Sequence, residues 1–229
     1  MAQAKCDAHS TLIVGSKGSG KTLLAKRLVR ESSCITVVTS RPHEWEDVPN
    51  ARVVRSGIVA MLDELINQTP TVAEHATAPS HAVVLDEIDW ATENVQKSIG
   101  FQMLMMQGRH YTVRLVIIHR PWSTFEVNAG DPKVQSCVSR KAQLPCFTPM
   151  TRCNFDQVLL TSLCKQSDLD KIIRDHCECE HWPRSSIDDL NALMITVNQD
   201  DSTALLIHKN SVNPVRCLDT NTCSIGHVA

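Results

Sequence analysis

Near the N-terminus stands Thr11-Leu12-Ile13-Val14-Gly15-Ser16-Lys17-Gly18-Ser19-Gly20-Lys21-Thr22, the stretch that decides the fold. Its last eight residues, Gly15–Thr22, fit the pattern G-x-x-x-x-G-K-[ST] at every fixed position. The residues before them, Thr11–Val14, are typical of a short apolar strand, and a helix is predicted from Lys21 to about Arg30. A strand, a glycine loop and a helix in this order form the context in which the pattern binds phosphate groups.

Each residue type in this phosphate loop has a physical role. The glycines let the backbone curl so that its N–H groups point at a polyphosphate, and the helix adds the positive end of its dipole. Lys21 can reach the β- and γ-phosphates, and the Thr22 hydroxyl is placed to coordinate Mg²⁺. Lys17 is either a further phosphate contact or a solvated loop lysine. The expected binding residues are Gly15, Ser16, Lys17, Gly18, Ser19, Gly20, Lys21 and Thr22.

Two later strands end in polar residues that complete a nucleotide site. The apolar strand His81–Asp86 is followed by Glu87. Because side chains alternate along a strand, we expect Asp86 to join the Mg²⁺ shell through water and Glu87 to polarise the attacking water. This acidic pair is typical of a hydrolase. His119 follows the next apolar strand, where a polar side chain can hydrogen-bond the γ-phosphate and act as a sensor.

Apolar strands alternate with predicted helices along the rest of the chain. Because several strands are apolar throughout, we expect an α/β fold with a mostly parallel central sheet flanked by helices. A C-terminal β-hairpin is predicted from Met194–Val197 and Thr203–Ile207, and the last twenty residues show no clear periodicity. We expect one domain over residues 1–229, with a core of about 9–208 and a tail of 209–229. The other predicted strands are Ile35–Thr39, Arg52–Val54, Val113–Ile118, Ser136–Gln143 and Asp156–Thr161, and the other helices are Ile58–Asn67, Thr92–Gln107, Ser167–Arg174 and Ile187–Leu193.

The composition argues against several classes of protein. A formal net charge of -2 argues against a uniformly basic surface that coats nucleic acid. We expect no transmembrane segment and no secretion, because no apolar run approaches the roughly 20 residues of a membrane span and no signal peptide is recognisable. Most of the ten cysteines are then expected to be reduced thiols. His176–His181 contains four candidate zinc ligands, but their spacing favours a reduced cysteine cluster over a zinc site.

Four segments together resemble the FtsK/HerA superfamily of RecA-like P-loop NTPases. Within it they are similar to the genome-packaging ATPases of large nucleocytoplasmic DNA viruses, virophages and membrane-containing double-jelly-roll phages. The segments are Gly15–Thr22, Val83–Glu87, Gly108–Val113 and Thr151–Leu160, and the resemblance spans roughly residues 9–208. The family usually carries Gln where this chain has His119. Histidine can also donate a hydrogen bond to phosphate, so the sensor role can survive with an altered pH dependence.

The resemblance implies an ATP-hydrolysing motor that translocates double-stranded DNA and packages a viral genome into a preformed capsid. Such motors act as homo-oligomeric rings, hexameric or pentameric, at a packaging vertex, with ATP and Mg²⁺ at the subunit boundaries. The implied location is the virion or the host-cell cytoplasm and viral factory, or the nucleus. Arg109 and Arg152 match family arginines that complete a neighbour's site, with Arg120 as a third candidate; a salt bridge is the alternative for each.

Other functions remain compatible with the same motifs. The chain could be another FtsK/HerA-type translocase or a phage-assembly ATPase of the zonula-occludens-toxin type. It could also be a nucleotide-regulated capsid assembly factor that hydrolyses ATP slowly and moves no DNA. Stimulation of hydrolysis by duplex DNA separates the motor from the assembly factor.

Overall fold

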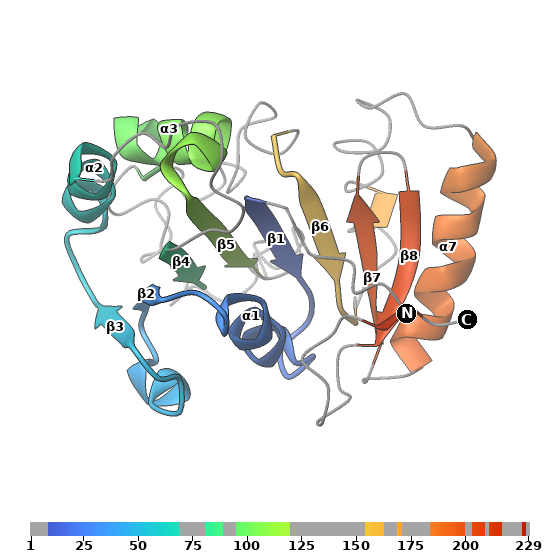
Figure 1. The fold of residues 1–229 in the computed structure, drawn as a ribbon. Coiled ribbons are helices and arrows are strands. Elements are labelled where there is room, and N and C mark those ends of the chain that lie inside the picture. The colour runs from blue at the N-terminus through green and yellow to red at the C-terminus, as the bar shows by residue number, and fades with distance from the viewer. Residues whose placement is uncertain are drawn as a thin grey trace, which may run out of the picture.

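A twisted sheet forms the centre of the computed structural model (Figure 1), which describes residues 9–68, 81–88, 95–119, 154–162, 169–170, 184–199, 203–208, 211–216 and 226–227. Within these residues the sheet has nine strands in the order β3-β2-β4-β5-β1-β6-β7-β8-β9. The first six pair in parallel, and β7, β8 and β9 follow in antiparallel pairing. The strands are β1 (Ser10–Val14), β2 (Cys34–Thr39), β3 (Ala51–Val54), β4 (His81–Asp86), β5 (Val113–His119), β6 (Gln157–Leu160), β7 (Thr203–His208), β8 (Ser211–Arg216) and β9 (Gly226–His227).

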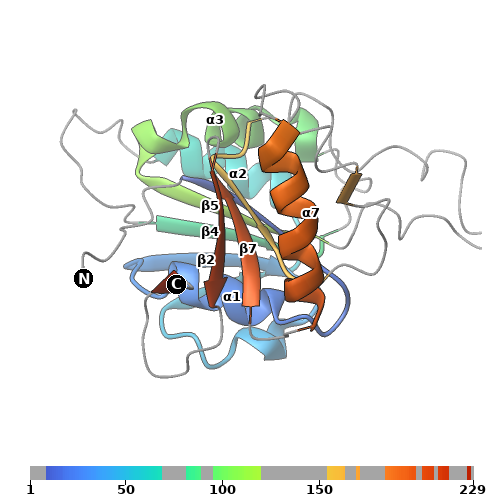
Figure 2. The same cartoon turned by 90° about the vertical axis from the view of Figure 1, so that its right-hand side faces the viewer.

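Two apolar cores lie on the two faces of the sheet, because side chains alternate along each strand. In β1, Leu12 and Val14 join one core, while Ile13 joins the other. Figure 2 shows α2 and α3 on one side of the sheet and α1 on the other. The predicted α/β architecture with a mostly parallel sheet flanked by helices is therefore confirmed. The helices are α1 (Lys21–Val29), α2 (Ile58–Gln68), α3 (Ile99–Gln107) and α7 (Arg184–Gln199), with 3₁₀ turns η1 (Pro42–Trp45), η2 (Val95–Lys97) and η3 (Gly108–Tyr111).

The C-terminal hairpin is present, and its predicted strand Thr203–Ile207 is confirmed as β7, but the other predicted strand is wrong. Residues Met194–Val197 belong to α7, and the hairpin is formed by β7 with β8. The physical reason is helical spacing: Leu190, Met194 and Val197 are buried in one core, which a helix achieves with one face. The predicted helix Ile187–Leu193 is accordingly longer at both ends. Strands β8 and β9 lie in the tail for which the sequence showed no periodicity.

The third helix begins later than predicted. The sequence predicts a helix over Thr92–Gln107, whereas α3 starts at Ile99 after the separate turn η2. Ser98 sets this boundary, because its side-chain oxygen accepts a hydrogen bond from the Phe101 backbone N–H at 3.2 Å, which is an N-cap.

Two other predicted elements cannot be compared with the structure. The strand Ser136–Gln143 lies outside the described residues. So does the helix Ser167–Arg174, except for Leu169 and Asp170, which are helical. Across the described ranges, every helix is too short or too polar to cross a bilayer.

Gly100 allows α3 to pack closely against α2. A Cβ atom built on Gly100 would lie 2.4 Å from the Leu62 carbonyl carbon and 2.6 Å from the Asp63 backbone nitrogen. The Gly100 backbone N–H also donates to Asp63 Oδ1 at 2.6 Å. The two helices therefore meet backbone to backbone at this position, which covers the sheet beside β4 and β5.

We expect Gly100→Ala to lower the free energy of unfolding by about 1–3 kcal/mol, because the added methyl group must push the helices apart. Urea denaturation measures the change. Met106→Ala is the matched control, since Met106 is on the exposed side of the same helix and should change stability by no more than about 0.5 kcal/mol. Equal stability of Gly100→Ala and the wild type would contradict this packing.

Candidate nucleotide-binding site

The phosphate loop lies where β1 ends and α1 begins. Gly18 and Gly20 have φ angles of 82° and 79°, in the left-handed region that glycine adopts without strain. Gly20 is the N-cap of α1, and no side-chain hydrogen bond caps the helix from this position. The first turn also lacks an acidic residue. The helix N-terminus therefore combines N–H donors with a positive dipole, which suits a phosphate group.

Thr161, directly after β6, supports the loop from the neighbouring strand. Its backbone N–H donates to the Val14 carbonyl oxygen at 2.9 Å, and its hydroxyl lies 2.6 Å from Ser19 Oγ. A Cβ atom on Gly15 would come within 1.7 Å of Thr161 Oγ1. Thr161, 146 positions away in the chain, thus leaves no room for a Cβ atom at residue 15. This steric reason for glycine is separate from any role of Gly15 toward phosphate. Sequence reasoning missed Thr161, because only the pairing of β1 with β6 brings it to the loop.

Lys21 is almost buried, with 5% of its side chain exposed. Its Nζ donates to the Ser16 carbonyl oxygen at 2.7 Å and lies 3.6 Å from Glu87 Oε1. A buried ammonium group needs such partners, because desolvation of an unpaired charge is costly. The predicted binding lysine and the predicted catalytic glutamate are therefore brought together. Lys17, by contrast, is exposed on the loop.

Asp86 ends β4 with its side chain fully buried. Its Oδ2 accepts a hydrogen bond from Trp45 Nε1 at 2.9 Å, and its Oδ1 lies 3.8 Å from Arg41 Nη2. Burial raises the pKa of Asp86, while the Trp45 hydrogen bond and the Arg41 charge act in the opposite direction. Oδ1 accepts no hydrogen bond from the described residues. If a Mg²⁺ ion were bound, this buried oxygen would reach it through water and the half-buried Thr22 hydroxyl would be a direct ligand.

Glu87 follows Asp86 in an unusual backbone conformation, with φ at 48°. Its backbone N–H donates to the Ile118 carbonyl oxygen at 3.1 Å, which ties the turn to β5. The carboxylate is 12% exposed and lies between two cations, Lys21 and Arg41. The two acidic residues therefore have different surroundings. Trp45 covers Asp86, whereas Glu87 faces the phosphate loop.

His119 ends β5 beside the phosphate loop, as the sequence predicted. It is paired in register with Val14, the last residue of β1, and is 4% exposed. In this strand order β5 lies between β1 and β4. Val14, His119 and Asp86 therefore lie side by side at the carboxyl-terminal ends of three neighbouring parallel strands. The sensor role of His119 stays a prediction.

The candidate finger arginines do not join this site in the described structure. The backbone of Arg109 belongs to η3, just before β5 begins, whereas the phosphate loop follows the carboxyl-terminal end of the parallel strand β1. Arg120 and Arg152 lie outside the described residues, as does His176–His181.

Arg41 and Trp45 are site residues that sequence reasoning missed. Both come from the segment after β2, whose strand pairs with β4. Arg41 contacts both carboxylates, at 3.8 Å for Asp86 and 3.2 Å for Glu87. A tryptophan in an acidic, polar loop was the available signal, because a buried indole N–H needs an acceptor.

We expect Trp45→Phe to destabilise the fold through loss of the indole donor to Asp86. In a double-mutant cycle with Asp86→Ala, the coupling energy should be about 1.5–3 kcal/mol, the range for a hydrogen bond to a charged group. Urea denaturation at pH 7 measures it. A parallel cycle of Trp45→Phe with Glu87→Gln should be nearly additive, because no hydrogen bond joins that pair in the structure. Additivity in the Asp86 cycle would contradict the assignment.

Comparison with known proteins supports this description of the fold. Residues 11–118 match the family described as ATPase family associated with various cellular activities (AAA). A search of curated proteins finds no match.

Solved structures with a similar fold include two packaging enzymes and a bacterial ATPase. B204, the DNA-packaging ATPase from Sulfolobus Turreted Icosahedral Virus, is 12% identical with a TM-score of 0.53, over 89% of this chain and 95% of that one. The genome packaging NTPase B204 from Sulfolobus turreted icosahedral virus 2 in complex with AMPPCP is 11% identical with a TM-score of 0.51, over 90% and 96%. EssC (ATPases 2 and 3) from Geobacillus thermodenitrificans is 12% identical with a TM-score of 0.51, over 93% of this chain and 40% of that one. The chain therefore has the fold of a P-loop NTPase, and its resemblance to genome-packaging ATPases is confirmed at the level of the fold.

Proposed function

We propose that this chain hydrolyses ATP and uses the free energy to move double-stranded DNA into a viral capsid. The observation that carries the proposal is the contact of Lys21 with Glu87 at the phosphate loop, where Lys21 also donates to the Ser16 carbonyl oxygen. A phosphate-binding lysine beside a glutamate is the arrangement that hydrolysis of a phosphoanhydride requires. The packaging role rests on the similarity to the B204 enzymes, two of whose structures contain ATP analogues.

Each residue of the site has a separate role in the proposed reaction. The loop N–H groups bind the phosphates, and Lys21 exchanges Ser16 and Glu87 for phosphate oxygens. Mg²⁺, held by Thr22 and through water by Asp86, would neutralise charge on the β- and γ-phosphates. Glu87 orients the attacking water and accepts its proton at a carboxylate oxygen. His119 donates a hydrogen bond to the γ-phosphate.

The chain works as a ring in this proposal, as a hexamer or pentamer at the packaging vertex, in the virion or the infected host cell. A net charge of -2 is compatible with DNA binding, because each basic group is repeated around the axis and every neutralised phosphate releases counterions. Contacts to backbone phosphates would make movement independent of DNA sequence. Arg109, Arg152 and Arg120 remain the candidates for an arginine that acts on the neighbouring subunit.

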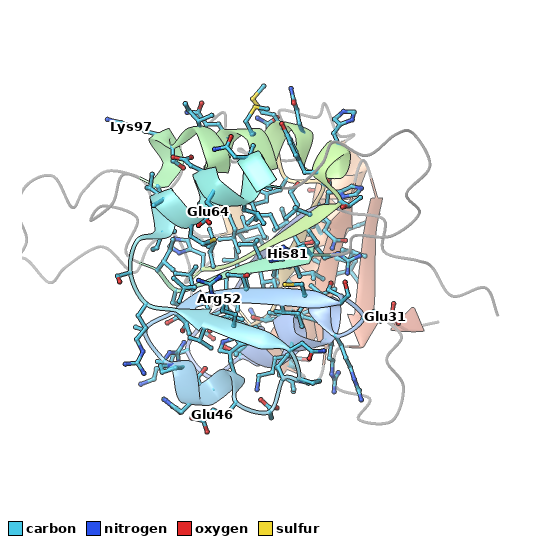
Figure 3. All side chains as sticks on the ribbon, turned by 60° about the vertical axis from the view of Figure 1, so that its left-hand side comes forward. Glu31, Glu46, Arg52, Glu64, His81 and Lys97 are labelled. Atoms are coloured by element: carbon cyan, nitrogen blue, oxygen red, sulfur yellow. The ribbon has the colours of Figure 1, made fainter. Side chains whose placement is uncertain are left out.

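Glu87→Gln should keep ATP binding and lower turnover by about 10²- to 10⁴-fold, the usual contribution of a general base. Lys21→Met should lose both binding and turnover. The measurements are binding of a fluorescent ATP analogue and phosphate release, with and without duplex DNA. Lys97→Gln, at an exposed position at the end of η2 (Figure 3), is the control and should match the wild type.

The same assay separates the motor from an assembly factor. Duplex DNA should stimulate phosphate release by the wild type and leave Glu87→Gln inactive. Hydrolysis without any DNA response would favour the capsid assembly factor, and a wild type that hydrolyses no ATP under either condition would refute the proposed enzyme.

His119→Gln should retain hydrolysis, since glutamine can also donate a hydrogen bond to the γ-phosphate from this strand end. His119→Ala should lower turnover, because the donor is lost. Steady-state phosphate release measures both variants. The sensor role is wrong if the glutamine variant is inactive and the alanine variant is not.

A further inference from the structure

Arg41 is the cation that bridges the two acidic residues of the site. Its Nη2 lies 3.2 Å from Glu87 Oε2 and 3.8 Å from Asp86 Oδ1. We propose that Arg41 is a positioning residue that holds the Glu87 carboxylate in the orientation needed to activate water. The inference rests on the proposed hydrolysis, and assigns a role to a residue that no sequence motif contains.

Glu87 needs an external restraint because of its own backbone. Its φ of 48° is uncommon for a residue with a side chain, and such conformations persist only where the surroundings hold them. Contacts to the carboxylate within the described residues include Lys21 at Oε1 and Arg41 at Oε2. When nucleotide binds, Lys21 is drawn to the phosphates in the proposed reaction. Arg41, on the other carboxylate oxygen, then stays on Glu87.

The two oxygens of Glu87 therefore have different tasks. Oε1, released by Lys21, faces the phosphate loop and can accept a hydrogen bond from the attacking water. Oε2 remains in its ion pair with Arg41. Because one oxygen is fixed, the other keeps a defined direction, and correct geometry of this kind contributes strongly to rate.

Arg41 is itself fixed by its neighbours. Its Nη1 donates to Glu44 Oε1 at 2.7 Å, and its backbone N–H donates to Thr39 Oγ1 at 3.0 Å. Four residues after Arg41, Trp45 anchors the segment Arg41–Asp47 through its hydrogen bond to buried Asp86. The guanidinium group thus has a defined place although 36% of the side chain is exposed. An unrestrained surface arginine would lack these contacts.

The segment also reaches the helix of the phosphate loop. Lys26 of α1 pairs with Asp47, and its Nζ lies 5.9 Å from the centre of the Trp45 ring. Arg41–Asp47 therefore connects α1 with the end of β4. A shift of α1 on nucleotide binding would therefore also act on Arg41–Asp47, the segment that holds Glu87.

The test compares Arg41→Gln, Arg41→Lys and Glu44→Gln with the wild type. Turnover and the affinity for a fluorescent ATP analogue are measured separately. Arg41→Gln should bind the analogue normally and lower turnover by about 10²-fold, the cost of misplacing a catalytic group. Arg41→Lys should recover part of the rate, since a cation remains. Glu44→Gln should cause a smaller loss of the same kind. Arg27→Gln, the same change in the last turn of α1, should have no effect.

Three results would overturn the proposal: normal turnover in Arg41→Gln, a loss of turnover fully explained by weaker analogue binding, or an equal loss in Arg27→Gln. Crystal structures of the wild type and of Arg41→Lys and Arg41→Gln provide a readout independent of activity. The Glu87 carboxylate should keep its place in the lysine variant and move in the glutamine variant. An unmoved carboxylate in the glutamine variant would also refute the role of Arg41. If the wild type proves inactive, the proposed function fails, whereas these structures still decide whether Arg41 positions Glu87.

Discussion

A buried lysine must have partners, and this requirement organises the whole site. Lys21 lies almost completely out of water and is satisfied by the Ser16 carbonyl oxygen and the Glu87 carboxylate. The contact is available only if the ends of β1 and β4 lie close together on one edge of the sheet. Strand β5, between them, holds that spacing and adds His119 at the same edge. The apolar strands thus serve to bring one cation and one anion into reach.

The second acidic residue extends this arrangement toward the outer strands. Asp86 is fully buried, and burial raises its pKa, so it too needs donors and positive charge nearby. Trp45 and Arg41 supply these from the segment after β2. The result is an array of two carboxylates and two cations that spans the phosphate loop, β4 and the end of β2. In this array a change at any one member alters the partners of the others.

Much of the fold was predictable, because the decisive signals are local. Continuous apolar runs placed the parallel strands, and the glycine pattern placed the loop and α1. The errors lay where a short apolar run suits either a helix or a strand: Met194–Val197 became part of α7 because its helical neighbours share one buried face. The boundary of α3 was missed because its cap, Ser98, lies inside the predicted helix. Strand β8 contains Pro214 and shows no clear alternation, so pairing with β7 defines it.

The sequence by itself determined the phosphate loop, its lysine and the acidic pair, because each depends on residues that are adjacent in the chain. Tertiary structure alone decided which groups surround them. Trp45 reaches Asp86 across 41 positions, and Thr161 reaches Ser19 across 142. Arg41 meets Glu87 only because β2 pairs with β4. No local pattern encodes such contacts, since they arise from the order of strands in the sheet and from the need of buried polar groups for partners.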